Sequence, residues 1–345
     1  MARKEINGFY HKPRLKDSIF DLFSAPRYAL KFQIIFTSFI GIALSYFVLM
    51  ISSFFIMKLF GKHYQSFHFI GLIPFAIPSV DLPLLANFIL IIGYSISLSL
   101  FFATTLGISV QAFEVLKGTK EFIGPNIIEY IKNNFFNLFF LPFSFFIIIL
   151  TMISIISALL LFLKIPFIGH YLSAIIIPIT WIIMMVVLFS LIAAMNSILF
   201  FPAVTILWDT DIKGIVFQAF SIIWTRPWMI IGGILISIWN FTISFLGAIS
   251  IFIGSFWMLN RLFSILSIFH LKHTIYDISS FILNSMNSLP QFVKFEMIER
   301  AIIFWYFIFF IIAIAYAVSS FTISQMILFI RLKKAENDVD LLKIS

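Results

Sequence analysis

The chain lacks cysteine altogether and is poor in charged residues. Only 11% of its 345 residues are Asp, Glu, Lys or Arg, while 61% are hydrophobic. A soluble domain usually carries about 25% charged residues, which it needs to cover its surface. The absence of cysteine excludes disulfides, thiolate metal ligands, cysteine nucleophiles and palmitoylation. The composition therefore indicates an integral membrane protein.

Six apolar runs are each long enough to cross a membrane, for which a helix needs about 20 residues. Because the runs are continuous and not alternating, they do not fit a membrane β-barrel. They are Phe32–Met57, Leu84–Phe113, Phe135–Leu163, Tyr171–Phe200, Met229–Trp257 and Ala301–Ile330. The sequence predicts an all-α polytopic bundle of six transmembrane helices, forming one membrane domain over residues 1–345. We expect Pro202 to end the fourth helix, since proline removes a helical hydrogen bond.

Basic residues are distributed unequally between the two sides of this predicted bundle. Sixteen Lys and Arg residues fall on the side of both termini and seven on the other. The positive-inside rule then places both termini in the cytoplasm, with residues 1–31 as an arm and 331–345 as a tail. The first span is too long for a cleavable signal peptide, so we expect it to stay. The net charge of +8 favours contact with anionic membrane lipids over nucleic-acid binding.

Each predicted cytoplasmic segment carries a short amphipathic stretch before a span. The stretches are 16–24, 121–135 and 209–222, and each predicts a helix lying in the membrane interface. Trp224, Arg226 and Trp228 follow the third stretch and are predicted contacts for lipid or a partner. Either the chain repeats a unit of one interfacial helix and two spans, or these segments share only the chemistry of membrane entry.

The third of these units contains Phe201-Pro202-Ala203-Val204, Asp211, Ala219-Phe220-Ser221 and Arg226-Pro227-Trp228. This pattern resembles bacterial six-helix integral membrane proteins that are loosely related to the membrane domain of glycerophosphodiester phosphodiesterases. Outside this unit the likeness is one of layout, and the catalytic barrel of those phosphodiesterases has no counterpart here. The resemblance implies the architecture and a place in the bacterial inner (cytoplasmic) membrane, and it brings no activity with it.

The predicted spans contain no acidic or basic residue away from their ends. Ion-coupled transporters and proton relays place such residues at membrane depth, so this absence disfavours both. The larger polar residues there include Asn87, Asn196 and Asn240. Their commoner role is hydrogen bonding between helices, and the alternative is contact with a substrate in mid-membrane. The chain has 47 phenylalanines against 14 glycines and no G-x-x-x-G stripe, so we expect a loosely packed bundle.

The predicted outer loop, residues 259–299, carries two features with functional potential. His270, His273 and Asp277 follow a helical spacing that fits a zinc or copper site, although histidines in interfacial loops are commoner. Ile278, Phe281 and Ile282 form an apolar cluster that indicates either adsorption to the membrane or docking of another subunit.

Motifs for a nucleophile elbow, a zinc protease and a phosphate-binding loop are all missing from the sequence. We therefore expect no cofactor and a non-enzymatic inner-membrane scaffold or accessory subunit that binds other membrane proteins or lipids. The first alternative is a permease or a lipid-handling component of a transport system, which predicts a cavity lined around the asparagines. The second is a membrane enzyme that uses the outer histidines. The scaffold predicts no enclosed cavity.

Overall fold

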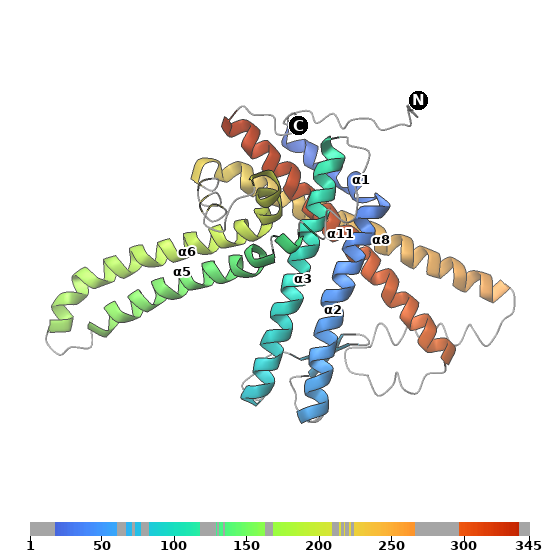
Figure 1. The fold of residues 1–345 in the computed structure, drawn as a ribbon, viewed down its shortest axis with the longest axis horizontal. Helices are drawn as coiled ribbons and strands as arrows, with labels where there is room; N and C mark the ends of the chain where they lie inside the picture. Colours follow the sequence, from blue (N-terminus) through green and yellow to red (C-terminus); the bar gives the residue numbers. More distant parts are fainter. Residues whose placement is uncertain are drawn as a thin grey trace. The chain divides into compact units, whose positions relative to one another are not determined.

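The computed structural model describes residues 18–60, 67–70, 73–76, 83–117, 129, 131–133, 135–162, 168–208, 214, 217, 221, 224–265 and 297–337. Within these ranges the chain is helical apart from one two-stranded hairpin (Figure 1). The long helices are α2 (Phe32–Phe60), α3 (Leu84–Lys117), α5 (Phe135–Phe162), α6 (Ile168–Trp208), α8 (Pro227–Ile265) and α11 (Met297–Asn337). Each coincides with one apolar run, so the helical architecture expected from the sequence is confirmed.

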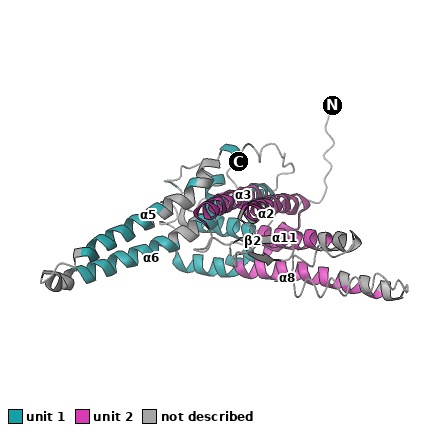
Figure 2. Cartoon of the chain, turned by 90° about the horizontal axis from the view of Figure 1, so that it is seen from below, with its two compact units in different colours: residues 1–23, 109–237, 322–345 teal, residues 24–108, 238–321 magenta. Residues whose placement is uncertain are grey.

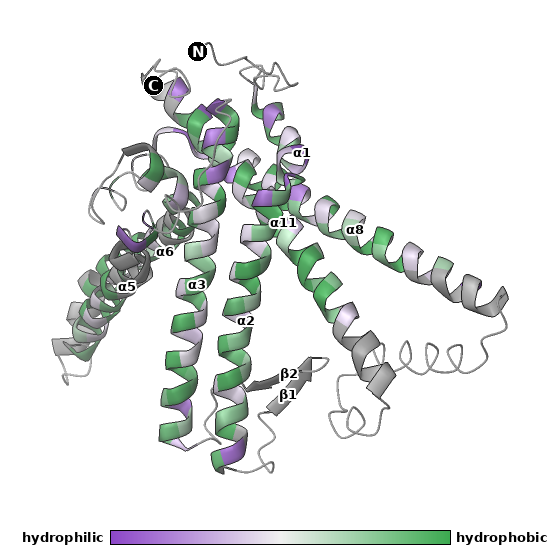
Figure 3. Ribbon diagram, turned by 45° about the vertical axis from the view of Figure 1, so that its right-hand side comes forward, coloured by the Kyte–Doolittle hydropathy of each residue, from purple (hydrophilic) through white to green (hydrophobic). Residues whose placement is uncertain are grey.

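Four of these helices are long and apolar enough to cross a membrane. The qualifying stretches are Phe32–Ile56, Leu84–Lys117, Pro227–Ser255 and Phe307–Leu332. In α5 and α6 the described apolar stretches are shorter, Leu150–Leu161 and Ile176–Ile192. Figure 3 shows hydrophobic residues along most of the length of α2 and α3. The structure thus supports a multi-pass membrane protein.

The prediction that Pro202 ends the fourth helix is wrong, because α6 continues through Pro178 and Pro202 to Trp208. Proline is tolerated in such helices when neighbouring groups satisfy the freed backbone. Several helices also extend beyond the ends of their apolar runs. The helix α3 ends at Lys117, after the run that ends at Phe113, and α8 ends at Ile265, after the run that ends at Trp257. Polar residues such as Lys and Gln form helix as readily as apolar ones, so hydropathy marks the membrane and not the helix end.

The all-helical prediction missed one hairpin, formed by β1 (Phe67–Ile70) and β2 (Ile73–Ala76). The two strands pair antiparallel, with Ile70 opposite Ile73. Aromatic and β-branched residues favour strands, and β2 packs against α2.

Contacts along the chain group into two compact units (Figure 2). Unit 1 comprises residues 1–23, 109–237 and 322–345, and unit 2 comprises residues 24–108 and 238–321. Three of the long helices, α3, α8 and α11, contribute residues to both.

In unit 2, α2 and α3 run side by side at close range (Figures 1 and 3). Gly41 of α2 lies against Thr104, and a Cβ atom added to Gly93 of α3 would stand 2.6 Å from the Ser52 hydroxyl. The Ser97 hydroxyl donates across the pair to the carbonyl oxygen of Ser45, at 2.8 Å. Small residues let the backbones approach, and the hydroxyl then finds an interhelical acceptor. The expectation of loose packing is therefore wrong for this helix pair.

In unit 1, the short 3-10 helix η1 (Ile19–Ser24) is tied to α11 by an ion pair. Arg331 Nη2 donates to Asp21 Oδ2 at 2.6 Å, and the two side chains are 6% and 10% exposed. Asp21 also accepts from the Ser18 backbone N–H at 3.3 Å, while the Ser18 hydroxyl accepts from the Phe20 N–H. These two bonds cap the start of η1: the Ser18 hydroxyl accepts from the second residue of the helix, and the Asp21 carboxylate accepts from the Ser18 N–H. The predicted amphipathic helix in 16–24 is thus a single short 3-10 helix over its described residues, and the side chain of Asp21 is 10% exposed.

The rest of the described part of unit 1 includes α5, α6, the end of α3, the start of α8 and the end of α11. Residues 322–332 of α11 are all buried, including Ser324 and Gln325. Phe329 packs on Phe200 of α6 with ring centroids 6.0 Å apart. The helices α5 and α6 run side by side as a hairpin (Figures 1 and 2). The predicted stretches 121–135 and 209–222 lie mostly outside the described residues.

Replacing Gly41 with alanine should destabilise the protein by about 1–3 kcal/mol, because the new methyl group overlaps Thr104 in a well-packed contact. Thermal unfolding in mild detergent measures this. Gly254→Ala is the matched control, since a Cβ there meets no atom within 4 Å. Equal melting temperatures for the two variants would refute the close α2–α3 contact.

Replacing Arg331 with methionine should cost about 3–5 kcal/mol, because it removes the cation that pairs with the largely buried Asp21 carboxylate. The double variant Asp21→Leu/Arg331→Met should recover much of the loss, since no charge is then buried. Arg27→Met, at an exposed arginine of α1 (Ala25–Ala29), serves as control and should change stability little. A double variant no more stable than Arg331→Met alone would contradict the ion pair.

Candidate functional site

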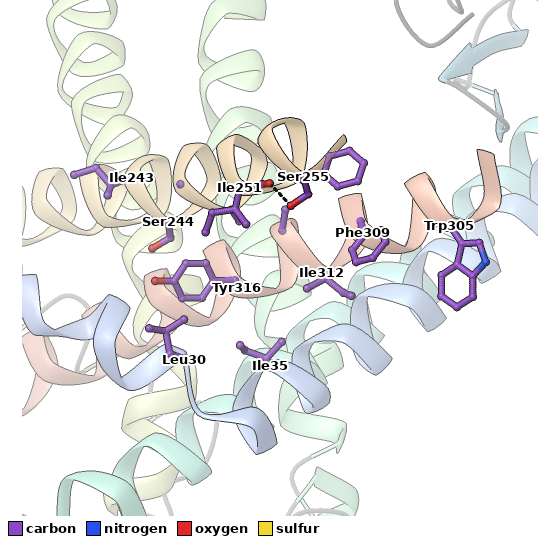
Figure 4. A pocket seen from close by; sticks show the side chains of 14 residues that line it. Leu30, Ile35, Ile243, Ser244, Ile251, Ser255, Trp305, Phe309, Ile312 and Tyr316 are labelled. Atoms are coloured by element: carbon purple, nitrogen blue, oxygen red, sulfur yellow. Dashed lines mark hydrogen bonds between the residues drawn. The ribbon is translucent and has the colours of Figure 1, made fainter. Parts of the chain in front are cut away.

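Unit 2 contains an apolar groove between α8 and α11, with a volume of about 800 Å³. Leu30 and Ile35, from the start of α2 and the residues before it, border its third side. The lining includes Ile243, Ile251 and Phe252 of α8 and Trp305, Phe309 and Ile312 of α11 (Figure 4). Pockets for small organic ligands measure roughly 300–1,000 Å³ and are mostly apolar, so the groove has the size and character of a ligand site.

The spacing of the lining residues shows that one face of each helix forms the groove. On α8 the lining positions are 243–244, 247–248, 251–252 and 255, and on α11 they are 305, 309, 312–313 and 316. These are helical intervals of three and four residues. The α8 face includes Ser244, Gly247, Ala248 and Ser255, and a Cβ atom on Gly247 would meet nothing within 4 Å. Small side chains on α8 thus leave open the space that larger ones would fill.

Aromatic pairs hold α8 against α11 beside the groove. Phe252 contacts Phe309 with ring centroids 5.5 Å apart. Phe241 meets Phe321 edge-to-face, with ring centroids 6.4 Å apart. Residue numbers rise along α8 as they fall along α11, so the two helices run antiparallel here. Such pairs add about 0.5–1.5 kcal/mol each beyond the burial of their area.

Three hydroxyl groups line the groove. The Tyr316 hydroxyl donates to the carbonyl oxygen of Pro26 at 3.3 Å, and Ser255 donates to the carbonyl oxygen of Ile251 at 2.8 Å. Ser244 is buried, and its Oγ has no hydrogen-bond partner among the described residues. Figure 4 shows the Ser244 and Tyr316 hydroxyls at the same end of the groove. Among the described lining residues none is Asp, Glu, Lys, Arg or His. The groove is therefore an uncharged, largely apolar channel, with the hydroxyls of Ser244 and Tyr316 at one end.

The predicted mid-membrane asparagines do not line this groove where the structure describes them. Asn87 is half-buried on α3 and Asn240 is 2% exposed on α8, and neither is among the lining residues. Asn196 lies in α6, with its side chain outside the described part. The cavity that the transport hypothesis places around these asparagines is therefore not the groove found here.

Sequence reasoning missed Ser244 and Tyr316 because it searched for large polar groups. The usable signal was the face of small residues on α8, at positions 244, 247, 248 and 255. A face of small residues predicts either the close approach of a partner helix or a gap beside it. The sequence does not distinguish the two, because the position of the facing helix is set by the tertiary structure.

Trp224, Arg226 and Trp228 are all exposed, on the surface of unit 1. The two indoles are 80% and 83% exposed, and the Trp224 ring meets Phe189 of α6 edge-on at 6.1 Å. Their predicted role as contacts for lipid or a partner stays a prediction, and exposure is what that role requires.

The predicted metal ligands His270, His273 and Asp277 lie outside the described residues, as do Ile278, Phe281 and Ile282. The described part of the chain holds no group of three His, Cys, Asp or Glu residues that could bind a metal ion. Of the predicted loop 259–299, residues 259–265 continue α8 and residues 297–299 begin α11.

Comparison with protein-family models, with curated proteins and with solved structures found no match to this chain. The groove is therefore interpreted from its own geometry and chemistry.

Proposed function

We propose that this protein is a non-enzymatic membrane protein that holds the hydrocarbon chain of a lipid between α8 and α11. The observation that carries the proposal is the apolar groove of about 800 Å³, which lies on two helices that are apolar enough to cross a membrane. Apolar cavities of this kind exclude water, and in a bilayer the available solvent is the acyl chain.

The length of the groove suits one leaflet of a membrane. Ile243 and Ser255 are twelve residues apart on α8, which is about 18 Å along a helix. The hydrocarbon core of a bilayer is roughly 30 Å thick, so each leaflet supplies about half of that. A single extended chain therefore spans the groove from end to end.

In a membrane, such a chain has to be held by van der Waals packing against the protein, because the hydrophobic effect contributes little. A lipid tail leaves surroundings that are as apolar as the groove, so its transfer gains little from the hydrophobic effect. The gain comes from the contact of the chain with rigid side chains, Phe252 and Phe309 among them. A protein that works in this way binds one chain in a fixed place while bulk lipid exchanges around it.

The membrane topology that we propose has six spans with both termini in the cytoplasm of a bacterium. The helices α5 and α6, with 28 and 41 residues, are long enough to supply the two further spans. The ion pair of Asp21 with Arg331 joins the N-terminal segment to the end of α11. That contact supports termini on one side of the membrane and hence an even number of spans.

A protein that binds a lipid chain in this way has one of two roles. As an accessory subunit it would use exposed residues such as Trp224 and Trp228 to contact other membrane proteins. As a lipid-handling component of a transport system it would pass its bound chain onward, and the groove itself favours this second candidate. Lipid binding is common to both.

A phospholipid with a diazirine in its acyl chain tests the proposal. In reconstituted wild-type protein, we expect cross-links concentrated in residues 243–255 and 305–316. Gly247→Leu places a side chain in the open space of the groove and should reduce this labelling at least fivefold. Labelling spread evenly over all apolar helix faces would refute the groove as a binding site.

Gly254→Leu is the matched control for this experiment. It puts the same side chain on the same helix, again where nothing lies within 4 Å of the Cβ, but at a position that does not line the groove. Labelling of residues 243–255 should stay at the wild-type level. If both variants lose labelling equally, the loss reflects a general disturbance of α8 and the proposal fails.

A further inference from the structure

One serine inside the groove behaves differently from its neighbours on the same helix. Ser237 and Ser255 each donate their hydroxyl to the backbone carbonyl four residues earlier, at 2.8 Å. Ser244 makes no such bond, and its Oγ has no hydrogen-bond partner within the ranges that the structure describes. The side chain is only 2% exposed. Burying an unpaired hydroxyl is unfavourable, so Ser244 is suited to a partner that enters the groove.

The Tyr316 hydroxyl lies at the same end of the groove (Figure 4). It donates its proton to the carbonyl oxygen of Pro26. A phenolic oxygen also accepts hydrogen bonds. Towards the groove, Tyr316 is thus an acceptor, while Ser244 keeps both its donor and its acceptor capacity.

The lining restricts the charge of any head group at this end. The described lining residues include no Lys, Arg or His to neutralise an anion, and no Asp or Glu to neutralise a cation. An ion in such surroundings pays a large desolvation penalty without a counter-charge. The head group has to be neutral.

We propose that the groove selects a neutral lipid that carries a hydroxyl group at one end of a single hydrocarbon chain. The hydroxyl oxygen accepts from Ser244, and its proton is donated to the oxygen of Tyr316. The chain then runs along α8 and α11 towards Ser255 and Trp305. This inference rests on the proposed function and adds the class of lipid to it.

Hydroxyl fits this pair of groups better than the other neutral heads. An ether or an ester carbonyl accepts from Ser244 but has no proton for Tyr316. A plain hydrocarbon offers no acceptor to Ser244 and no proton to Tyr316. An alcohol should therefore bind more tightly than its own methyl ether or the matching alkane.

The test uses 1-hexadecanol with a diazirine near the far end of its chain as the label, with protein reconstituted in phosphatidylcholine nanodiscs. Competitors are unlabelled 1-hexadecanol, its methyl ether and hexadecane. Hydrogen bonds of ordinary strength predict that the alcohol competes about tenfold better than either. An isoprenoid alcohol and its own methyl ether form a second arm, which distinguishes a straight-chain source from an isoprenoid one.

Tyr316→Phe should abolish the preference for alcohol over ether, because it removes the acceptor of the alcohol proton, and Ser255→Ala should leave that preference unchanged. Ser244→Ala is the second variant: it removes the hydrogen bond that alcohol and ether share, so it should reduce the preference of either one over the alkane. Because the readout is a ratio between two competitors on one protein, a merely destabilised variant does not mimic the result.

Equal competition by alcohol, ether and alkane in the wild type would overturn the hydroxyl assignment and leave lipid binding in the groove intact. A preference for alcohol over ether that survives in Tyr316→Phe, or a preference for alcohol over alkane that is unchanged in Ser244→Ala, would overturn it as well. If no competitor displaces the label from residues 243–255 and 305–316, the proposed function fails and this inference fails with it.

Discussion

A backbone amide in hydrocarbon has no water to bond with, and this constraint underlies every long element of the structure. It forces the apolar runs into helices, where each carbonyl meets the amide four residues on. The same constraint governs the hydroxyl side chains. Ser45, Ser237 and Ser255 each donate to the carbonyl of the residue four earlier. Two described serines differ from this pattern. The Ser244 hydroxyl has no hydrogen-bond partner among the described residues, and the Ser97 hydroxyl donates to a carbonyl of the neighbouring helix.

Small residues have opposite consequences in different parts of unit 2. Gly41 and Gly93 allow α2 and α3 to touch, and a methyl group at either position would collide with a hydroxyl-bearing side chain. Gly247 and Ala248 instead line a groove between α8 and α11, where a Cβ atom on Gly247 would meet nothing within 4 Å. Small residues therefore line a close helix contact between α2 and α3 and a groove of lipid size between α8 and α11. Which of the two forms depends on the side chains of the facing helix.

The charged residues of this chain are few, and the one buried ion pair that is described lies near the end of a helix. Arg331 closes the apolar stretch Phe307–Leu332 of α11, and Asp21 reaches it from the N-terminal segment. The described middles of α2, α3, α8 and α11 contain no Asp, Glu, Lys or Arg. A groove lined without charge follows naturally from such a bundle, and it selects neutral ligands by the cost of desolvating charged ones.

Composition and hydropathy were enough to determine the class of this protein, its six long helices and most of their starting points, since these depend on local apolar runs and the backbone's need for hydrogen bonds. They could not show that α6 continues through Pro202 or that α3 extends to Lys117. A helix can continue beyond the apolar residues that cross the membrane. Tertiary structure alone decided that Asp21 meets Arg331 across more than three hundred residues. It alone decided that Ser244 and Tyr316 share one end of a groove. The sequence of an apolar helix does not show whether a hydroxyl bonds the backbone of its own helix or is left to bind a ligand.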